Sequence, residues 1–177
     1  MSMSTSRATA ELLKHNDENL ADFTCGVIIL SDRASRKEYE DKAGPMAQAC
    51  LAAMGARHML PVEVIPDDES ALTRAIRAQS MKGASLIITS GGTGLAPRDM
   101  TPDVLLKIGE RVVPGIGELV RAAGAKFTPT SYLSRSVAVT IGKTLIVALP
   151  GNPNAVRQSL EALKELLPHA LATLLKD

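Results

Sequence analysis

The 177-residue sequence is poor in aromatic residues, with no tryptophan, two phenylalanines and two tyrosines. A surface that stacks on nucleic-acid bases is built from aromatic side chains, so this scarcity argues against such a platform. The net charge of +1 gives no electrostatic reason to bind nucleic acid or a membrane surface. No apolar run approaches the roughly 20 residues that cross a bilayer. We therefore expect a protein that neither binds nucleic acid nor associates with membranes.

Cysteine and histidine are also scarce. The two cysteines, Cys25 and Cys50, lie in apolar stretches, which favours free thiols in a reducing compartment over a disulfide. Residues 1–22 are polar and lack the apolar stretch of a secretory signal, so we expect a cytoplasmic protein. The three histidines are far apart and have no cysteine or carboxylate at ligand spacing, which argues against a zinc site.

The sequence does supply an aliphatic core. Hydrophobic residues make up 45% of the chain, and the core must be built mainly from alanine, leucine, isoleucine, valine and methionine. The length suits one domain of ordinary size. We expect this domain over residues 23–177, preceded by an N-terminal arm over residues 1–22.

Short apolar runs bounded by glycine or polar residues predict buried strands. Such runs cover residues 25–30, 58–65, 84–89, 136–141 and 144–149. The last two are separated by Gly142-Lys143 and are expected to form a hairpin. Helical patterns lie between the other runs. The predicted fold is therefore α/β, a three-layer α/β/α arrangement around a mostly parallel central sheet with a short hairpin.

The rest of the chain is organised around residues 87–103. Here an apolar run is followed by residues 90–94, which turn where the chain needs the conformational freedom of glycine. Thr101 is the expected N-cap of the next helix, with a proline and an aspartate in its first turn. Backbone N–H groups at the turn, the positive helix end and Arg98 together favour a phosphate or carboxylate ligand.

Other helix ends are marked by polar residues and proline. We expect Asp68 and Glu69 to cap the helix that runs to about Gln79. Asn154 is the expected N-cap of the final helical stretch. Pro168 is expected to divide that stretch into two helices, because proline interrupts a helix interior.

The stretch from Ser90 to Asp103 is similar to the signature of the molybdopterin adenylyltransferases, the family of the gephyrin G-domain type. Four further stretches agree with this family in the same order: Ser31–Ser35, Ile65–Asp68, Leu133–Ser136 and Leu149–Asn154. The resemblance implies the molybdopterin-binding fold. It also implies transfer of AMP from ATP to the terminal phosphate of molybdopterin, with release of pyrophosphate and with Mg²⁺ as the cofactor.

The resemblance singles out Asp67 for a catalytic or metal-binding role. Asp67 and Asp99, each in a loop at the end of a predicted strand, are the candidate catalytic residues and Mg²⁺ ligands. The candidate phosphate, pterin and nucleotide contacts are Ser31, Asp32, Arg33, Gly91, Gly92, Thr93, Gly94, Arg98, Thr101, Asp103, Ser134, Arg135, Ser136, Pro150, Gly151 and Asn152. Since the nucleophile is already an anionic phosphate, positioning and charge neutralisation are expected to carry the catalysis.

Several of these residues have a structural alternative. Arg33 and Arg98 are candidate phosphate partners through a bidentate fork. For Arg98, an ion pair with Asp99 or Asp103 is an equal alternative. For Asp32 and Arg33, the alternative is a solvated pair in a turn.

The resemblance also implies partners. It predicts a homotrimer that binds molybdopterin and ATP and hands its product to a molybdenum-inserting protein. The alternative function is a non-catalytic molybdopterin carrier or scaffold module of the same fold. Such a carrier would bind the pterin but release no pyrophosphate.

Overall fold

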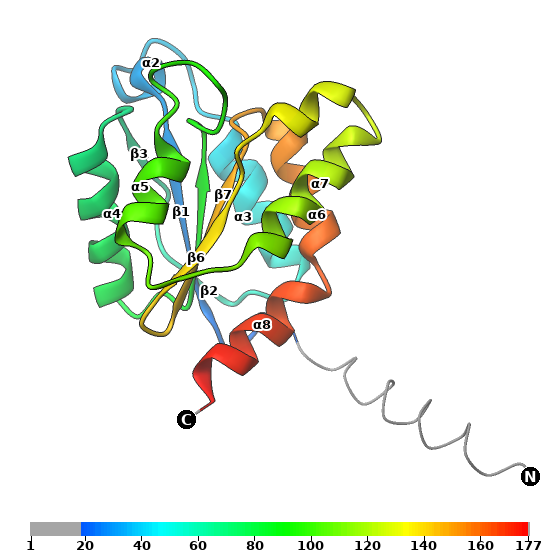
Figure 1. Ribbon diagram of the computed structural model, residues 1–177. Coiled ribbons are helices and arrows are strands. Elements are labelled where there is room, and N and C mark those ends of the chain that lie inside the picture. Colours follow the sequence, from blue (N-terminus) through cyan, green and yellow to red (C-terminus); the bar gives the residue numbers. More distant parts are fainter. Residues whose placement is uncertain (1–18, 177) are drawn as a thin grey trace, which may run out of the picture.

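The computed structural model describes residues 19–176, which form a central sheet covered by helices on both faces (Figure 1). Its strands are β1 (Thr24–Leu30), β2 (His58–Met59), β3 (Glu63–Ile65), β4 (Leu86–Ser90), β5 (Arg111–Val112), β6 (Ala138–Ile141) and β7 (Thr144–Leu149). The strand order is β2-β1-β4-β7-β6-β5, and β3 also pairs with β1. The pairs among β1 to β4 and β7 are parallel, whereas β6 is antiparallel to both β5 and β7.

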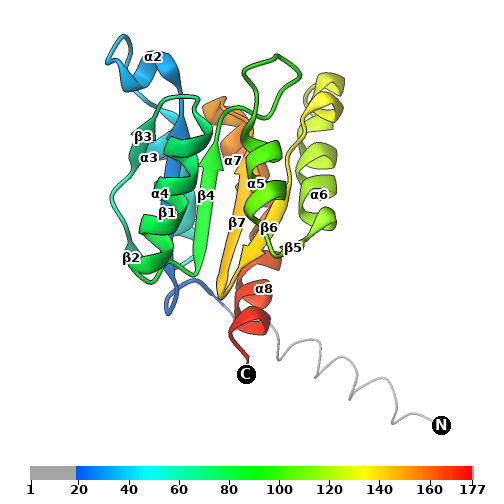
Figure 2. The same cartoon turned by 60° about the vertical axis from the view of Figure 1, so that its left-hand side comes forward.

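The helices are α2 (Asp32–Ser35), α3 (Ala43–Ala53), α4 (Glu69–Met81), α5 (Thr101–Ile108), α6 (Pro114–Ala125), α7 (Pro153–Leu163) and α8 (Leu166–Leu175), with a 3₁₀ helix η2 (Pro129–Leu133). One core cluster joins the sheet to α3, α6, α7 and α8, and the other joins it to α4 and α5. Figure 2 shows α4 and α5 in front of the sheet and α3 and α7 behind it. The predicted three-layer fold is confirmed.

Continuous apolar runs form the central strands because both faces of the sheet are covered. Every residue of β4 and β7 is buried. The predicted hairpin is confirmed, with Ile141 opposite Thr144 and Gly142 at a φ of +54° in the turn. The run at residues 58–65 forms two short strands instead of one. Pro61 lies between them and has no N–H for a ladder hydrogen bond.

Two of the expected helix caps are wrong. Helix α5 begins at Thr101 itself, and the Thr101 hydroxyl donates to the Gly91 carbonyl at 2.9 Å instead of capping the helix. Helix α7 is capped by Asn152, whose side-chain oxygen accepts from the N–H groups of Asn154 and Ala155. The N-cap of α5 is Met100, which makes no side-chain cap bond, whereas α7 begins one residue after its capping side chain.

Two further helix ends agree with the prediction in part. The Asp68 side chain accepts from the Ala71 N–H and caps α4, as expected. The expected capping role of Glu69 is wrong, because its side chain forms an ion pair with Lys107 of α5. The final stretch is divided between Leu163 and Leu166, and Pro168 lies in the first turn of α8. Proline has no N–H to donate to the carbonyl four residues earlier, which places the break before it.

The predicted N-terminal arm, residues 1–22, lies mostly outside the described residues. Of its described part, Leu20 is fully buried in the core shared with α3. Cys25 and Cys50 are free thiols. Among residues 19–176, no helix combines the length and apolar character needed to span a membrane.

The sheet topology creates one crevice at its carboxyl edge. From β1 the chain runs through α2 and α3 to β3 on one side, whereas from β4 it runs through α5 to β5 on the other. Strands β1 and β4 are adjacent and parallel, so the loops that follow them diverge from a common point. In open α/β sheets ligands bind at such a reversal of strand order.

Candidate functional site

The predicted site residues lie in loops at this carboxyl edge, at the top of Figure 1. They follow β1, β3, β4 and β7, and the segment before β6 joins them. Five stretches that are far apart in the sequence are thus brought to one end of the sheet. The site is described below from the glycine turn outward.

The turn after β4 needs glycine at two positions. Gly91 and Gly92 have φ values of +108° and +66°, and a Cβ at Gly91 would run into the carbonyl oxygen of Leu30. The Gly91 N–H donates to the Leu149 carbonyl at 3.1 Å. Thr101 stabilises the turn through two hydrogen bonds. Its N–H donates to the Gly92 carbonyl at 3.1 Å, and its hydroxyl donates to the Gly91 carbonyl. The glycines therefore let three neighbouring backbones approach closely.

Asp32 and Asp67 form a reciprocal pair between the loops after β1 and β3. The Asp32 N–H donates to Oδ2 of Asp67 at 3.1 Å, and the Asp67 N–H donates to Oδ1 of Asp32 at 3.0 Å. Burial raises the pKa of the Asp67 carboxyl, with further upward contributions from the charges of Asp32 and Asp99. The Asp32 N–H and the Arg98 charge act in the opposite direction. Asp67 is thus held in a place where its negative charge is unfavourable.

Arg98 reaches across the crevice and forms an ion pair with Asp32. The alternative of a pair with Asp99 or Asp103 is therefore wrong, because the loop carries Arg98 toward β1 and away from α5. Its side chain is 71% exposed. Arg33 stays within its own loop, where it lies 5.2 Å from the centre of the Tyr39 ring.

Asp99 closes its own loop. Its Oδ2 accepts from the Ala96 N–H at 2.9 Å, and a Cβ at Gly94 would lie 2.6 Å from that oxygen. The charge of Asp99 contributes to the raised pKa of Asp67, so the two carboxylates lie near enough at this end of the sheet to interact electrostatically. Within residues 19–176, no group of three or more His, Cys, Asp or Glu side chains is arranged to hold a metal ion.

The segment before β6 lies against the glycine turn. The Arg135 N–H donates to the Thr93 carbonyl at 2.8 Å, and the Ser134 hydroxyl donates to Oγ1 of Thr93 at 3.4 Å. The hydroxyls of Ser134 and Ser136 are 2.9 Å apart. Arg121 of α6 supports this segment through the carbonyls of Ser134 and Ser136.

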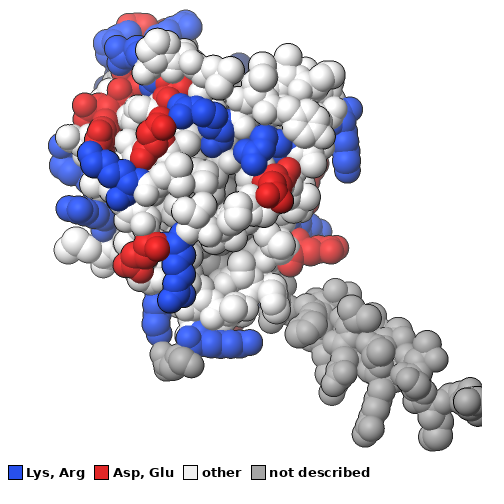
Figure 3. Space-filling view, in the orientation of Figure 1, with Lys and Arg blue, Asp and Glu red and all other residues white. Residues whose placement is uncertain are grey.

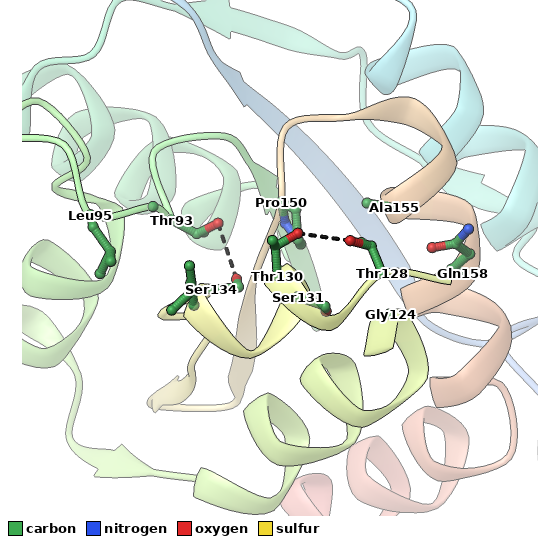
Figure 4. Close-up of a pocket in the computed structure, with 12 residues that line it drawn as sticks. Thr93, Leu95, Gly124, Thr128, Thr130, Ser131, Ser134, Pro150, Ala155 and Gln158 are labelled. Carbon is green, nitrogen blue, oxygen red and sulfur yellow. Dashed lines mark hydrogen bonds between the residues drawn. The ribbon is translucent and has the colours of Figure 1, made fainter. Parts of the chain in front are cut away.

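A cavity of about 430 Å³ opens between the glycine turn, η2 and the start of α7 (Figure 4). Thr93 and Ser134 lie on one side of it, and Thr128, Thr130 and Gln158 lie on the other. Figure 3 shows mixed acidic and basic residues over α2 and the loop before α5, but few charges over η2. We call this space the η2 cavity.

A second cavity of about 360 Å³ lies between the ends of β1 and β7 and the start of α3. Its lining includes Ser31, Gly151 and Ser90 together with Tyr39 and Lys42. We call it the α3 cavity. The lining of these two cavities includes neither Asp67 nor Asp99.

Sequence reasoning missed several lining residues. Thr128, Thr130 and Ser131 of the η2 cavity come from a Thr-Pro-Thr-Ser run directly before a predicted site stretch, and that polar run was a usable signal. Gln158 of α7 and Tyr39 of the α3 cavity carry no comparable signal, because only the packing of distant elements brings them to the site.

Fold and site together define a doubly wound α/β protein whose glycine turn, paired aspartates and arginine meet at one carboxyl edge. The chain matches the family described as "Probable molybdopterin binding domain" over residues 26–169. It belongs to this family, as the resemblance predicted.

Two relatives illustrate the likeness. The chain is 39% identical over 155 residues to the molybdenum cofactor biosynthesis bifunctional protein of Synechococcus elongatus, covering 88% of this chain but only 48% of that protein. It is 39% identical over 142 residues to the molybdopterin adenylyltransferase of Haemophilus influenzae, covering 79% of this chain and 72% of the relative. The chain thus spans about half of the first relative and most of the second.

Solved structures agree. The molybdopterin biosynthesis enzyme MoaB from Thermus thermophilus superposes with a TM-score of 0.79 at 39% identity, covering 86% of this chain and 96% of the other. The molybdopterin biosynthesis Mog protein from Mycobacterium ulcerans gives a TM-score of 0.77 at 39% identity, covering 86% and 99%.

Proposed function

We propose that the protein is a molybdopterin adenylyltransferase, which transfers AMP from ATP to the terminal phosphate of molybdopterin and releases pyrophosphate. The observation that carries this proposal is the meeting of the glycine turn, Asp67 and Asp99 at one carboxyl edge beside two cavities. The names of relatives such as that of Haemophilus influenzae support the same activity. The protein would act in molybdenum cofactor biosynthesis in the cytoplasm.

Each of the two cavities would bind one of the two substrates. The η2 cavity has the size of a small-molecule site, and its hydroxyl groups suit the polar edge of a pterin. The α3 cavity, with Tyr39 and Lys42 in its lining, would take the nucleotide. The phosphates of both substrates then meet between them, at the glycine turn.

For this reaction the protein must bring two anions together, the molybdopterin phosphate and the triphosphate of ATP. The molybdopterin phosphate is the nucleophile, and its attack on the α-phosphorus breaks the bond to pyrophosphate. Backbone N–H groups of residues 92–94 would face the phosphates, since the Gly91 N–H donates to the Leu149 carbonyl. Arg98 would exchange its exposed pair with Asp32 for a phosphate oxygen.

Asp67 and Asp99 fit magnesium, because carboxylate oxygens are the protein ligands that this ion prefers. When bound, magnesium would neutralise charge on the transferred and leaving phosphates. The pairing with Asp32 fixes the orientation of Asp67 for this task.

Pyrophosphate release in the presence of molybdopterin, ATP and Mg²⁺ tests the proposal. Asp67→Asn and Asp99→Asn should each lower kcat by about 10²-fold or more, because electrostatic stabilisation of the transition state is lost. The matched control is Asp68→Asn, which exchanges one N-cap residue for another and should keep the rate. Molybdopterin binding without pyrophosphate release by the unaltered protein would reject the enzyme and indicate a carrier.

We also propose a homotrimer that passes its adenylylated product to a molybdenum-inserting protein. Support comes only from the family to which the chain belongs. Sedimentation at micromolar concentration should give the mass of three chains. A monomer at that concentration would reject the trimer without affecting the proposed reaction.

A further inference from the structure

We infer that Arg135 is a positioning residue that fixes the loop carrying Asp99, and that it does not bind substrate phosphate. The expected effect on kcat rests on the proposed function, whereas the expected effect on the loop does not. It differs from the expectation that Arg135 contacts a ligand directly. The main evidence is that a single guanidinium donates hydrogen bonds to carbonyl groups at both ends of the same loop.

The contacts of Arg135 converge on residues 94–103. Its Nε–H donates to the Gly94 carbonyl at 2.8 Å, and one terminal nitrogen donates to the Asp99 carbonyl. The other terminal nitrogen donates to both carboxylate oxygens of Asp103, at 3.0 and 2.9 Å. Gly94 and Asp99 are the two ends of the loop, so the guanidinium sets the distance between them.

The guanidinium has five N–H donors in a fixed planar fork. Each of its three nitrogens already donates to the protein: Nε to Gly94, one terminal nitrogen to Asp99 and the other, shared between two oxygens, to Asp103. No nitrogen of the fork is therefore left without a protein acceptor, and a phosphate would have to compete with these contacts. Arg98 offers the contrast, because its side chain is 71% exposed and its ion-pair partner is Asp32.

Stability alone does not explain this arrangement. The Asp103 side chain is 61% exposed, and an ion pair with so exposed a partner contributes little to stability. The bonds to the carbonyls of Gly94 and Asp99 do something that the ion pair does not, because they hold the backbone at the two ends of residues 94–99. Since a displacement of about 1 Å can cost about 10²-fold in rate, fixing this backbone affects catalysis more than it affects folding.

Arg135→Lys tests the inference, because lysine keeps the charge but cannot bond Gly94, Asp99 and Asp103 at once. We expect kcat to fall by about 10- to 100-fold. The Kd values for molybdopterin and for a non-hydrolysable ATP analogue should stay within about threefold. Amide hydrogen exchange of residues 94–101 should become about tenfold faster, because local opening becomes easier.

The control is Arg157→Lys, which makes the same exchange in an exposed pair with Glu161 on α7 and should change none of these quantities. Asp103→Asn is a second, milder variant in case Arg135→Lys does not fold. It should move kcat and loop exchange in the same direction by a smaller factor.

Two results would overturn the inference: a loss in ligand affinity with unchanged kcat, or unchanged exchange in residues 94–101. If the unaltered protein releases no pyrophosphate, the proposed function fails. The exchange measurement then still decides whether Arg135 holds the loop.

Discussion

Asp67 carries a carboxyl group whose negative charge is disfavoured by its surroundings in the fold. Burial raises the pKa of its carboxyl, followed by unfavourable contributions from Asp32 and Asp99, and the nearby Arg98 offsets these only in part. The folded protein therefore binds the Asp67 proton more tightly than the unfolded chain does. Stability falls as the pH rises from the ordinary range of an aspartate through this raised pKa.

Asp67→Asn should consequently raise the free energy of unfolding at neutral pH. The asparagine oxygen can still accept from the Asp32 N–H, so the pairing of the two loops is kept. The gain should shrink as the pH is lowered, because the native carboxyl is then protonated and uncharged. Urea unfolding of both proteins over a pH series measures this, and a gain that grows toward acid pH would contradict the assigned cause.

Burial acts on the two thiols in the same direction as on Asp67. Burial raises the pKa of Cys25 to about 12, and burial also raises the pKa of the half-buried Cys50. Since the thiolate is the reactive form, neither residue is suited to nucleophilic catalysis. Of Cys25, Cys50 and Asp67, whose pKa values burial raises, only Asp67 is a predicted site residue.

At the level of single elements, the start of α7 depends on one side chain. Asn152→Ala should cost about 1 kcal/mol, because its side-chain oxygen accepts from the N–H groups of Asn154 and Ala155. Asn154→Ala is the matched control and should change the free energy of unfolding by less than about 0.5 kcal/mol. Equal costs for the two variants in chemical denaturation would reject Asn152 as the cap.

The glycine turn after β4 allows a similarly matched comparison. Gly91→Ala and Gly83→Ala both place a Cβ at positive φ, +108° and +86°. At Gly83 the new atom meets nothing within 4 Å, whereas at Gly91 it meets the Leu30 backbone.

Gly83→Ala should therefore cost about 1–2 kcal/mol from backbone strain alone, and Gly91→Ala should cost more and also remove activity. Thermal unfolding and the pyrophosphate assay measure the two effects. A Gly91→Ala protein as stable and active as Gly83→Ala would show that close approach at the turn is unimportant.

The success of sequence reasoning at this scale depended on whether a feature is local. The turn at Gly91 and the hairpin at Gly142 follow from residues within a few positions, and both were predicted. The partners of Arg98 and Arg135 do not follow from nearby residues. Asp32 and the Asp99 carbonyl come close to them only because β1, β4 and β6 belong to the same sheet. Thr101 was assigned as a cap because its competing acceptor, the Gly91 carbonyl, lies in another turn.

At the scale of the whole molecule, the core extends beyond the sheet and its helices. Leu20 precedes β1 and is fully buried, and its N–H donates to the Met54 carbonyl at 3.1 Å. Leu20→Ala should lower the free energy of unfolding by about 3 kcal/mol through lost burial and the cavity left behind. Met81→Ala, at a side chain that is 89% exposed, should change it by less than about 0.5 kcal/mol. Similar melting temperatures for the two variants would place Leu20 outside the core.

The lengths of the outer strands limit how copies of this protein can associate. On one side the sheet ends in β2 and β3, of two and three residues, and on the other in β5, of two. Long unpaired ladders are the templates on which chains stack laterally into filaments, and very short outer strands remove them. For residues 19–176, association by edge-to-edge strand pairing is therefore disfavoured, and overproduction should not favour amyloid-like growth from the native state.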